Sequence, residues 1–125
     1  MTKYKIATAL SALYLTLLSD AFASQVKVSN NTDDTIHVFF RGKESKKSPH
    51  VESVPAHSSQ TFIITDEYID NQFLFQAIAS TNRRGNPDWK LLAGTCDELN
   101  KDTDYTLIIE TTKMGLKTSC TSISQ

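Results

Sequence analysis

Short runs that alternate between apolar and polar side chains limit most strongly what this chain can fold into. Residues 35–41 place Ile36, Val38 and Phe40 on one face and polar or mixed side chains on the other. A period of two residues is typical of a β-strand with one buried face, whereas an amphipathic helix repeats every 3.6 residues. Because residues 105–111 show the same period, the sequence predicts an all-β fold.

The expected strands are short, and turn-forming segments separate them. Residues 51–54 read as an edge strand ended by Pro55, which has no amide hydrogen to donate to a sheet. Residues 72–80 are apolar on both faces, which favours a central strand. The other expected strands are residues 26–28, 35–41, 60–65, 89–93, 105–111 and 116–123. Seven or eight such strands predict an antiparallel β-sandwich, with an immunoglobulin-like outline as one form and a small barrel as the alternative.

The aromatic side chains are expected to fill the core of this sandwich. Phe73 shares a strand face with Phe75, so both are expected inside. Phe39 shares a face with His37 and Arg41, and two positions stay open for it: exposed, or covered at an edge. The remaining expected core aromatics are Phe40, Phe62 and Tyr105. Each buried large side chain stabilises the fold by roughly 1.5–3 kcal/mol.

The first 23 residues have the composition of a secretory signal peptide. A basic start with Lys3 and Lys5 precedes an apolar run over residues 6–18, and Ala21-Phe22-Ala23 matches an Ala-x-Ala cleavage site. The apolar run is shorter than the roughly 20 residues that a membrane-spanning helix needs. We therefore expect cleavage after Ala23, no membrane anchor, and a periplasmic or secreted protein.

The mature chain expected from this cleavage is a single domain of residues 24–125. It carries 11 Lys and Arg against 13 Asp and Glu, a formal charge of 11 − 13 = −2. Nucleic acids and anionic membranes are bound through clustered positive charge, so this balance argues against both partners. Its two cysteines, Cys96 and Cys120, are expected to form a disulfide in an oxidising compartment.

Motifs for catalysis or metal binding are weak. The chain has no Gly-x-Ser-x-Gly, His-Glu-x-x-His or Cys-x-x-Cys motif, so we expect no catalytic residue, cofactor or metal. His50 and His57 are expected to be solvated loop residues, because a metal site needs three or four converging ligands. Residues 97–104 read as an acidic loop, in which Asn100 and Asp102 begin a calcium-like pattern that lacks the required glycine.

Two loops rich in basic residues are the candidate contact surface. Loops carry most of the binding residues on β-sandwiches, and Arg and Trp are frequent at interface hot spots. If both loops lay at one end of the sandwich, they would suit an acidic protein or an anionic glycan. The predicted binding residues are Arg41, Lys43, Lys46, Lys47, Arg83, Arg84 and Trp89.

Three functions fit these features to different degrees. An exported, non-catalytic binding protein agrees best with charged loops on apolar strands and with the missing catalytic motifs. A small inhibitor of an exported hydrolase, such as a lysozyme or a protease, is the alternative, because rigid loops lose little entropy on binding. A small enzyme would require a triad that is assembled only in three dimensions. The sequence leaves the oligomeric state open.

Overall fold

A computed structural model describes residues 23–81 and 92–123, and of Leu92 and Ala93 only the backbone. The described part contains eight strands and one short helix. They are β1 (Ser24–Asn31), β2 (Ile36–Gly42), β3 (His50–Val54), β4 (Ser58–Ile64), α2 (Asp66–Ile69), β5 (Leu74–Ser80), β6 (Leu92–Asn100), β7 (Tyr105–Thr112) and β8 (Gly115–Ser122). The prediction of an all-β chain with seven or eight short strands is confirmed.

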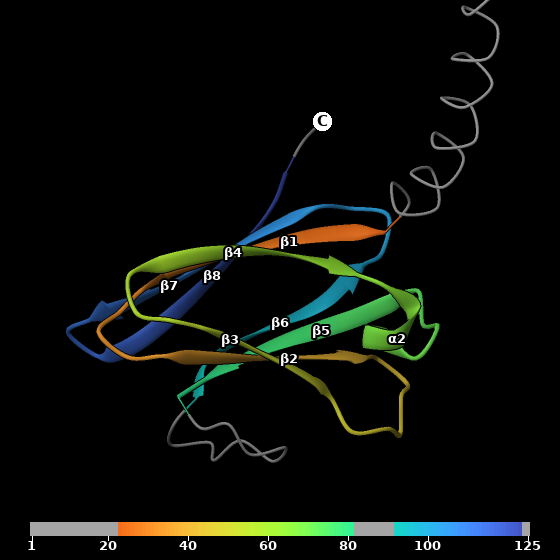
Figure 1. Ribbon diagram of the computed structural model, residues 1–125, viewed down its shortest axis with the longest axis horizontal. Helices are drawn as coiled ribbons and strands as arrows, with labels where there is room; N and C mark the ends of the chain where they lie inside the picture. The colour runs from red at the N-terminus through yellow and green to blue at the C-terminus, as the bar shows by residue number, and fades with distance from the viewer. Residues whose placement is uncertain (1–22, 82–91, 124–125) are drawn as a thin grey trace, which may run out of the picture.

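The strands form two four-stranded sheets that pack face to face (Figure 1). The first sheet has the order β4-β1-β7-β8, and the second has the order β3-β2-β5-β6. The sandwich prediction is confirmed, and the barrel alternative is wrong because no ladder joins the two sheets among the described strands. One pair departs from the antiparallel expectation, since β1 runs parallel to β7, with Val26 opposite Tyr105.

The core lies between the two layers and follows the alternation of the sequence. Ile36, Val38 and Phe40 of β2 are all fully buried, as their shared face predicts. Rings from the two sheets meet there: Phe40 lies 5.9 Å from Phe62 between ring centroids, and Phe75 lies 6.3 Å from Tyr105. β5 is a central strand between β2 and β6, as expected from its apolar faces.

Two aromatic residues differ in burial although both lie in strand-like segments. Phe39 is fully buried on the outer face of the second sheet, opposite Val51 and Ile78 in the two neighbouring strands. Phe73 is 52% exposed because β5 begins only at Leu74, so the alternation that predicts a core position does not apply to it. The core prediction for Phe73 is therefore wrong.

The strand β6 is longer at its C-terminal end than the sequence suggests. It runs as far as Asn100, so residues 97–100 belong to a strand and the prediction of an acidic loop over 97–104 is wrong for them. The register slips between Phe75 and Ala77 of β5, which face Leu99 and Cys96. This β-bulge interrupts the two-residue period, so the sequence pattern does not reveal that residues 97–100 belong to a strand.

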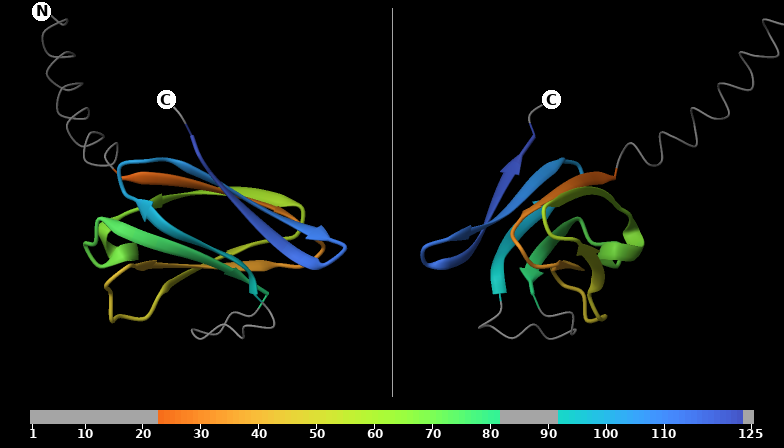
Figure 2. Two further views of the ribbon diagram at one scale, coloured as in Figure 1. Left: turned by 180° about the vertical axis from the view of Figure 1, so that it is seen from behind. Right: turned by 60° about the vertical axis from the view of Figure 1, so that its left-hand side comes forward.

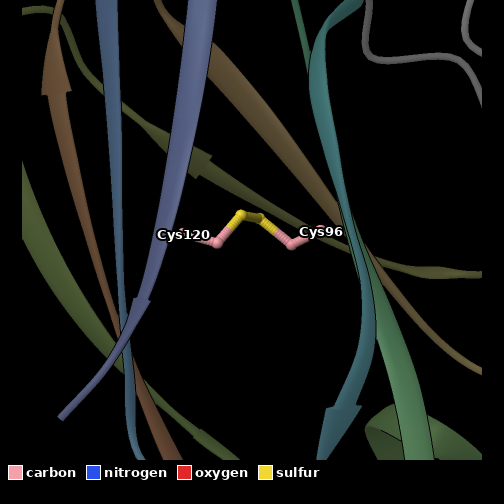
Figure 3. The surroundings of a disulfide bond; sticks show 2 residues. All are labelled: Cys96 and Cys120. Carbon is pink, nitrogen blue, oxygen red and sulfur yellow. A yellow bond between two sulfur atoms is a disulfide. The ribbon is translucent and has the colours of Figure 1, made fainter.

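The predicted Cys96–Cys120 disulfide is present, and it joins the edges of the two sheets. It links β6 to β8, and the Cα atoms of the two residues are 6.2 Å apart (Figure 3). Close to it, Gly94 adopts φ +149°, and a Cβ there would lie 2.7 Å from the Cβ of Thr118. The two sheets therefore approach each other closely on the side that the disulfide closes.

A buried asparagine joins two turns at one end of the sandwich. Nδ2 of Asn30 donates to the carbonyls of Asp34, Val54 and Pro55 at 2.8, 2.9 and 3.1 Å. Its Oδ1 accepts from the amide and the hydroxyl of Thr32 at 3.0 and 2.7 Å. Asn30 opens the Asn30-Asn31-Thr32 sequon, but its amide is fully buried and hydrogen-bonded in this way. It is a structural residue.

The two ends of the sandwich differ. The helix α2 lies at one end, and the hairpin between β7 and β8 reaches the opposite end (Figures 1 and 2). We define the α2 end as residues 42–49, 65–73 and 97–104. A search of the described helical segments finds none with the length and apolar character that a bilayer crossing requires.

Candidate functional site

Backbone hydrogen bonds hold three connecting segments together at the α2 end. The amide of Lys43 donates to the carbonyl of Leu74 at 2.9 Å, and the amide of Lys101 donates to the carbonyl of Phe73 at 3.1 Å. Ser24 Oγ donates to the carbonyl of Thr103 at 2.5 Å. The connections after β2, α2 and β6 therefore form one surface.

A glycine lets the loop after β2 approach the α2 segment. A Cβ on Gly42 would overlap the Ile69 carbonyl and the side chain of Gln72. After α2 the chain turns through two residues with left-handed backbone conformation, Asp70 with φ 53° and Asn71 with φ 59°. Asp and Asn tolerate this conformation better than most residues do. Asp70 and Asn71 thus explain why the helix ends at Ile69, and Gly42 explains how the loop after β2 can pack against it.

The β-bulge in β6 places two carboxylates beside the loop after β2. Asp97 and Glu98 together lie opposite the single residue Gln76, and Glu98 has a left-handed backbone with φ 54°. Lys43 Nζ lies 3.0 Å from Glu98 Oε1, and Gln76 Nε2 donates to Asp97 Oδ1 at 2.6 Å. A non-glycine residue in this region is strained by roughly 1–2 kcal/mol. The surroundings of Glu98 therefore impose its conformation.

An open depression of about 360 Å³ lies at this bulge. Its lining residues are Lys43, Phe75, Gln76, Asp97 and Glu98. The polar groups in the lining comprise one ammonium, one carboxamide and two carboxylates, so the depression is suited to hydrogen bonding. Among the described residues, no group of three or more His, Cys, Asp and Glu side chains could hold a metal ion. The polar groups of the lining pair with one another, Lys43 with Glu98 and Gln76 with Asp97.

Ion pairs connect the segments of the α2 end. The Lys43–Glu98 hydrogen bond raises the pKa of Lys43, and the charge of Glu98 adds to this effect. Lys47 Nζ lies 2.8 Å from Asp70 Oδ1, and the hydrogen bond between them raises the pKa of Lys47. The third pair, Lys101–Asp66, has a distance of 3.6 Å. Exposed pairs of this kind add little stability, but each of these three joins two different segments of the α2 end.

The α2 end carries an excess of negative charge. It contains four lysines and eight carboxylates, a formal charge of 4 − 8 = −4, whereas the remainder of residues 24–125 carries 7 − 5 = +2. The lysines are Lys43, Lys46, Lys47 and Lys101, and the carboxylates are Glu44, Asp66, Glu67, Asp70, Asp97, Glu98, Asp102 and Asp104. The lysines of the loop after β2 thus share this end of the sandwich with acidic residues of other segments.

The structure brings together only part of the predicted binding surface. Lys43, Lys46 and Lys47 lie at the α2 end, with Lys46 exposed and the other two in ion pairs. Arg41 lies half-buried on β2, and its Nε is buried with no hydrogen-bond partner among the described residues. The other predicted binding residues, Arg83, Arg84 and Trp89, lie outside the described residues.

The strand register shows where the second predicted loop is attached. Ser80, the last residue of β5, lies opposite His37 near the start of β2, whereas Phe75 lies opposite Gly42 at its end. The connection from β5 to β6 therefore leaves the second sheet at the end opposite to α2. The described strands do not meet the condition that both basic loops start from one end of the sandwich.

Several residues of the site were not predicted from the sequence. Asp70, Gln76, Asp97 and Glu98 were not among the expected binding residues, although each makes a polar contact at the α2 end. Lys43 and Glu98 are 55 residues apart in the chain, and only the strand register places them together. The sequence signal that could have revealed Glu98 is the break in the alternation of β6.

A second polar cluster lies at the edge of the second sheet. His50 Nε2 lies 2.7 Å from Glu52 Oε1, and the hydroxyl of Tyr68 donates to the same oxygen at 3.1 Å. The His50 and Tyr68 rings stack with their centroids 3.7 Å apart. Burial raises the pKa of Tyr68, and the bond to Glu52 raises it further. The prediction of a solvated loop residue is therefore wrong for His50, which begins β3.

The other histidines make polar contacts at the surface. His57 lies in an exposed turn with its Nε2 2.7 Å from Asp33 Oδ1, as expected for a solvated loop histidine. Nδ1 of His37 lies 2.8 Å from Ser53 Oγ on the outer face of the second sheet. A Ser–His contact on a sheet face is a cross-strand polar pair, and catalysis would further require an oxyanion site and an orienting group.

Comparisons with known proteins add a distant structural similarity. No family model matches the chain, and a search of curated proteins finds no similar sequence. One similar chain belongs to the structure of a disulfide-locked mutant of intermedilysin with human CD59; the TM-score is 0.45 and the sequence identity 9%. The similarity covers 81% of this chain, which spans about a quarter (24%) of that one. No conclusion about function follows from it.

Proposed function

We propose that this protein is an exported, non-catalytic binding protein and that the α2 end is its contact surface. The observation that carries the proposal is the left-handed backbone of Glu98, a strained residue in a β-bulge beside the open depression. Strained residues persist where their surroundings impose them, and they cluster at binding and catalytic sites. Bulges are also frequent beside functional sites, where they redirect side chains.

The hydrogen bonds and ion pairs that join the segments of the α2 end support a binding role. Backbone bonds fix Lys43 and Lys101 to β5 and its preceding residue, and ion pairs link the loop after β2 to both Asp70 and Glu98. A surface that is ordered before binding loses little conformational entropy when a partner arrives. The partner in this proposal is a protein, because the surface is made of three segments that are separated in the sequence and spans more than the depression alone.

Export is part of the proposal. The basic start, apolar run and Ala-x-Ala sequence support removal of residues 1–23, and the Cys96–Cys120 disulfide is compatible with an oxidising periplasm or exterior. The test is intact-mass measurement of the protein from its natural host. The expected mass is that of residues 24–125 with two hydrogens fewer than the reduced chain. A full-length mass would contradict export by cleavage.

The binding proposal is tested by capture from an extract of exported host proteins. The Asp97→Asn/Glu98→Ala double variant removes the bulge carboxylates, and Glu110→Gln near the opposite hairpin is the matched control. We expect the recovery of at least one captured protein to fall about tenfold with the double variant and to stay constant with the control. A tenfold loss corresponds to about 1.4 kcal/mol of binding free energy. Equal recovery from all three forms would refute the α2 end as the contact surface.

Inhibition of an exported hydrolase is a second candidate function, favoured by the formal charge of −4 at the α2 end. Several hydrolases, lysozyme among them, have cationic surfaces, and complementary charge speeds association and improves specificity. Titration of the protein into activity assays of a lysozyme and a panel of proteases tests this candidate. Unchanged activity at a molar excess of the protein would exclude inhibition of the enzymes assayed.

A further inference from the structure

We infer that the partner at the α2 end is a cationic protein and that Phe73 is the apolar anchor of the contact. This inference rests on the proposed function and specifies the chemistry of the partner. Four large hydrophobic side chains in the described part of the chain are exposed, namely Ile63, Phe73, Met114 and Ile123. Phe73 is the aromatic member of this set and the one that lies in the α2 end.

The backbone of Phe73 is fixed while its ring is exposed. The carbonyl of Phe73 accepts from Lys101, and that of Leu74 accepts from Lys43. Before it, Asn71 and Gln72 donate to carbonyls of α2 at 3.0 Å each. The ring has two side-chain torsions to order on binding, so a partner that covers it gains apolar burial at a low entropic cost. Aromatic residues, Phe among them, are enriched at the centre of protein interfaces.

The charge around Phe73 selects the kind of partner. Three of the four lysines of the α2 end are neutralised by ion pairs, while Glu44, Glu67 and Asp102 are exposed carboxylates on three different segments. An anionic glycan or lipid surface would be repelled by this field, and a basic protein would be attracted. A protein surface also supplies the apolar pocket that Phe73 requires, which a simple polycation does not.

The test is a calorimetric titration with three probes: lysozyme as a cationic globular protein, poly-lysine as a cation without an apolar pocket, and heparin as an anionic glycan. We expect lysozyme to bind at an ionic strength of about 0.01 M and to bind at least tenfold more weakly at about 0.15 M, because salt screens exposed charges. Phe73→Ser should weaken lysozyme binding about tenfold, the effect of a hot-spot residue worth about 1.4 kcal/mol. Met114→Ser is the control for an exposed hydrophobic side chain elsewhere and should have no effect.

Other outcomes overturn the inference. Binding of heparin in preference to lysozyme would show that the α2 end prefers an anionic partner. No binding of lysozyme at low ionic strength would also refute the inference of a cationic partner. If poly-lysine bound as tightly as lysozyme, or if Phe73→Ser bound lysozyme with unchanged affinity, Phe73 would not be the apolar anchor. If the host capture experiment nevertheless finds a partner that depends on Asp97 and Glu98, the binding function stands and only the cationic partner is rejected.

Discussion

Lys47 Nζ lies 2.8 Å from Asp70 Oδ1 and joins the loop after β2 to the residue that ends α2. The hydrogen bond from Lys47 lowers the pKa of Asp70 below its usual 3.8. A carboxyl with a lowered pKa contributes stability above the pKa of the unfolded state, and this stability is lost as the pH falls through the folded value. The contact therefore holds at neutral pH and weakens in acid.

Substitution of Lys47 should raise the pKa of Asp70 toward its usual value. In Lys47→Gln we expect the pKa of Asp70 to rise, because the donor of its main hydrogen bond loses its charge. Carboxyl NMR titration of the labelled protein measures this change. Lys46→Gln is the matched control, since Lys46 is an exposed neighbour on the same loop. This variant should leave the pKa of Asp70 unchanged. A pKa of Asp70 that is equal in all three proteins would contradict the assigned pair.

Tyr68 should titrate above the usual value of 10.0, because burial and the bond to Glu52 both favour its neutral form. We expect Glu52→Gln to lower the pKa of Tyr68 in part, leaving the shift due to burial. Since the folded-state pKa is raised, its stabilising contribution is complete below the unfolded-state value and disappears as the pH rises through the folded one. Phenolate absorbance during an alkaline titration follows the change, with Tyr68→Phe identifying the signal. An unaltered titration in Glu52→Gln would contradict the contact.

Replacement of Asn30 should destabilise the protein strongly. Asn30→Ala removes five hydrogen bonds in the described structure and takes away the acceptor of the buried Thr32 amide, so we expect a loss of about 2–4 kcal/mol. Urea unfolding followed by circular dichroism measures the loss. The exposed neighbour provides a control, because Asn31→Ala should change the free energy of unfolding by less than about 0.5 kcal/mol. Similar values for both variants would show that the network is dispensable.

Removal of the disulfide should lower stability without changing the fold. The chain-entropy model gives about 3.5 kcal/mol for a loop of this length, since the two cysteines are 24 residues apart. We expect Cys96→Ala/Cys120→Ala to lower the free energy of unfolding by about this amount, measured by denaturant titration. The oxidised protein should also resist thiol alkylation in its unfolded state. Two alkylated thiols without prior reduction would show that the bond is absent.

Much of the fold follows from local patterns in the sequence. The alternation around Phe40 identifies β2, and Pro55 correctly ends an edge strand. The disulfide follows from a cysteine count that permits a single intramolecular pairing. These features depend on neighbouring residues or on counting, and both are available before the strands pair.

The candidate site is less predictable because it depends on strand register. Phe73 belongs to an apolar run, and only the start of β5 at Leu74 leaves its ring exposed. The bulge at Asp97 and Glu98 looks like a loop because it disrupts the period of two. The sequence shows the lysines of the loop after β2 as a basic cluster, but the carboxylates that neutralise them come from residues 23 or more positions away.

The position of β1 between β4 and β7 has a consequence for the timing of folding. Ser24 and Thr103, which are joined by a hydrogen bond, are separated by 79 residues, so the first sheet is incomplete until nearly the whole polypeptide has been synthesised. Contacts this distant make folding slow. This late closure suits the proposed export, because a chain that is still unfolded can pass through a narrow translocation pore.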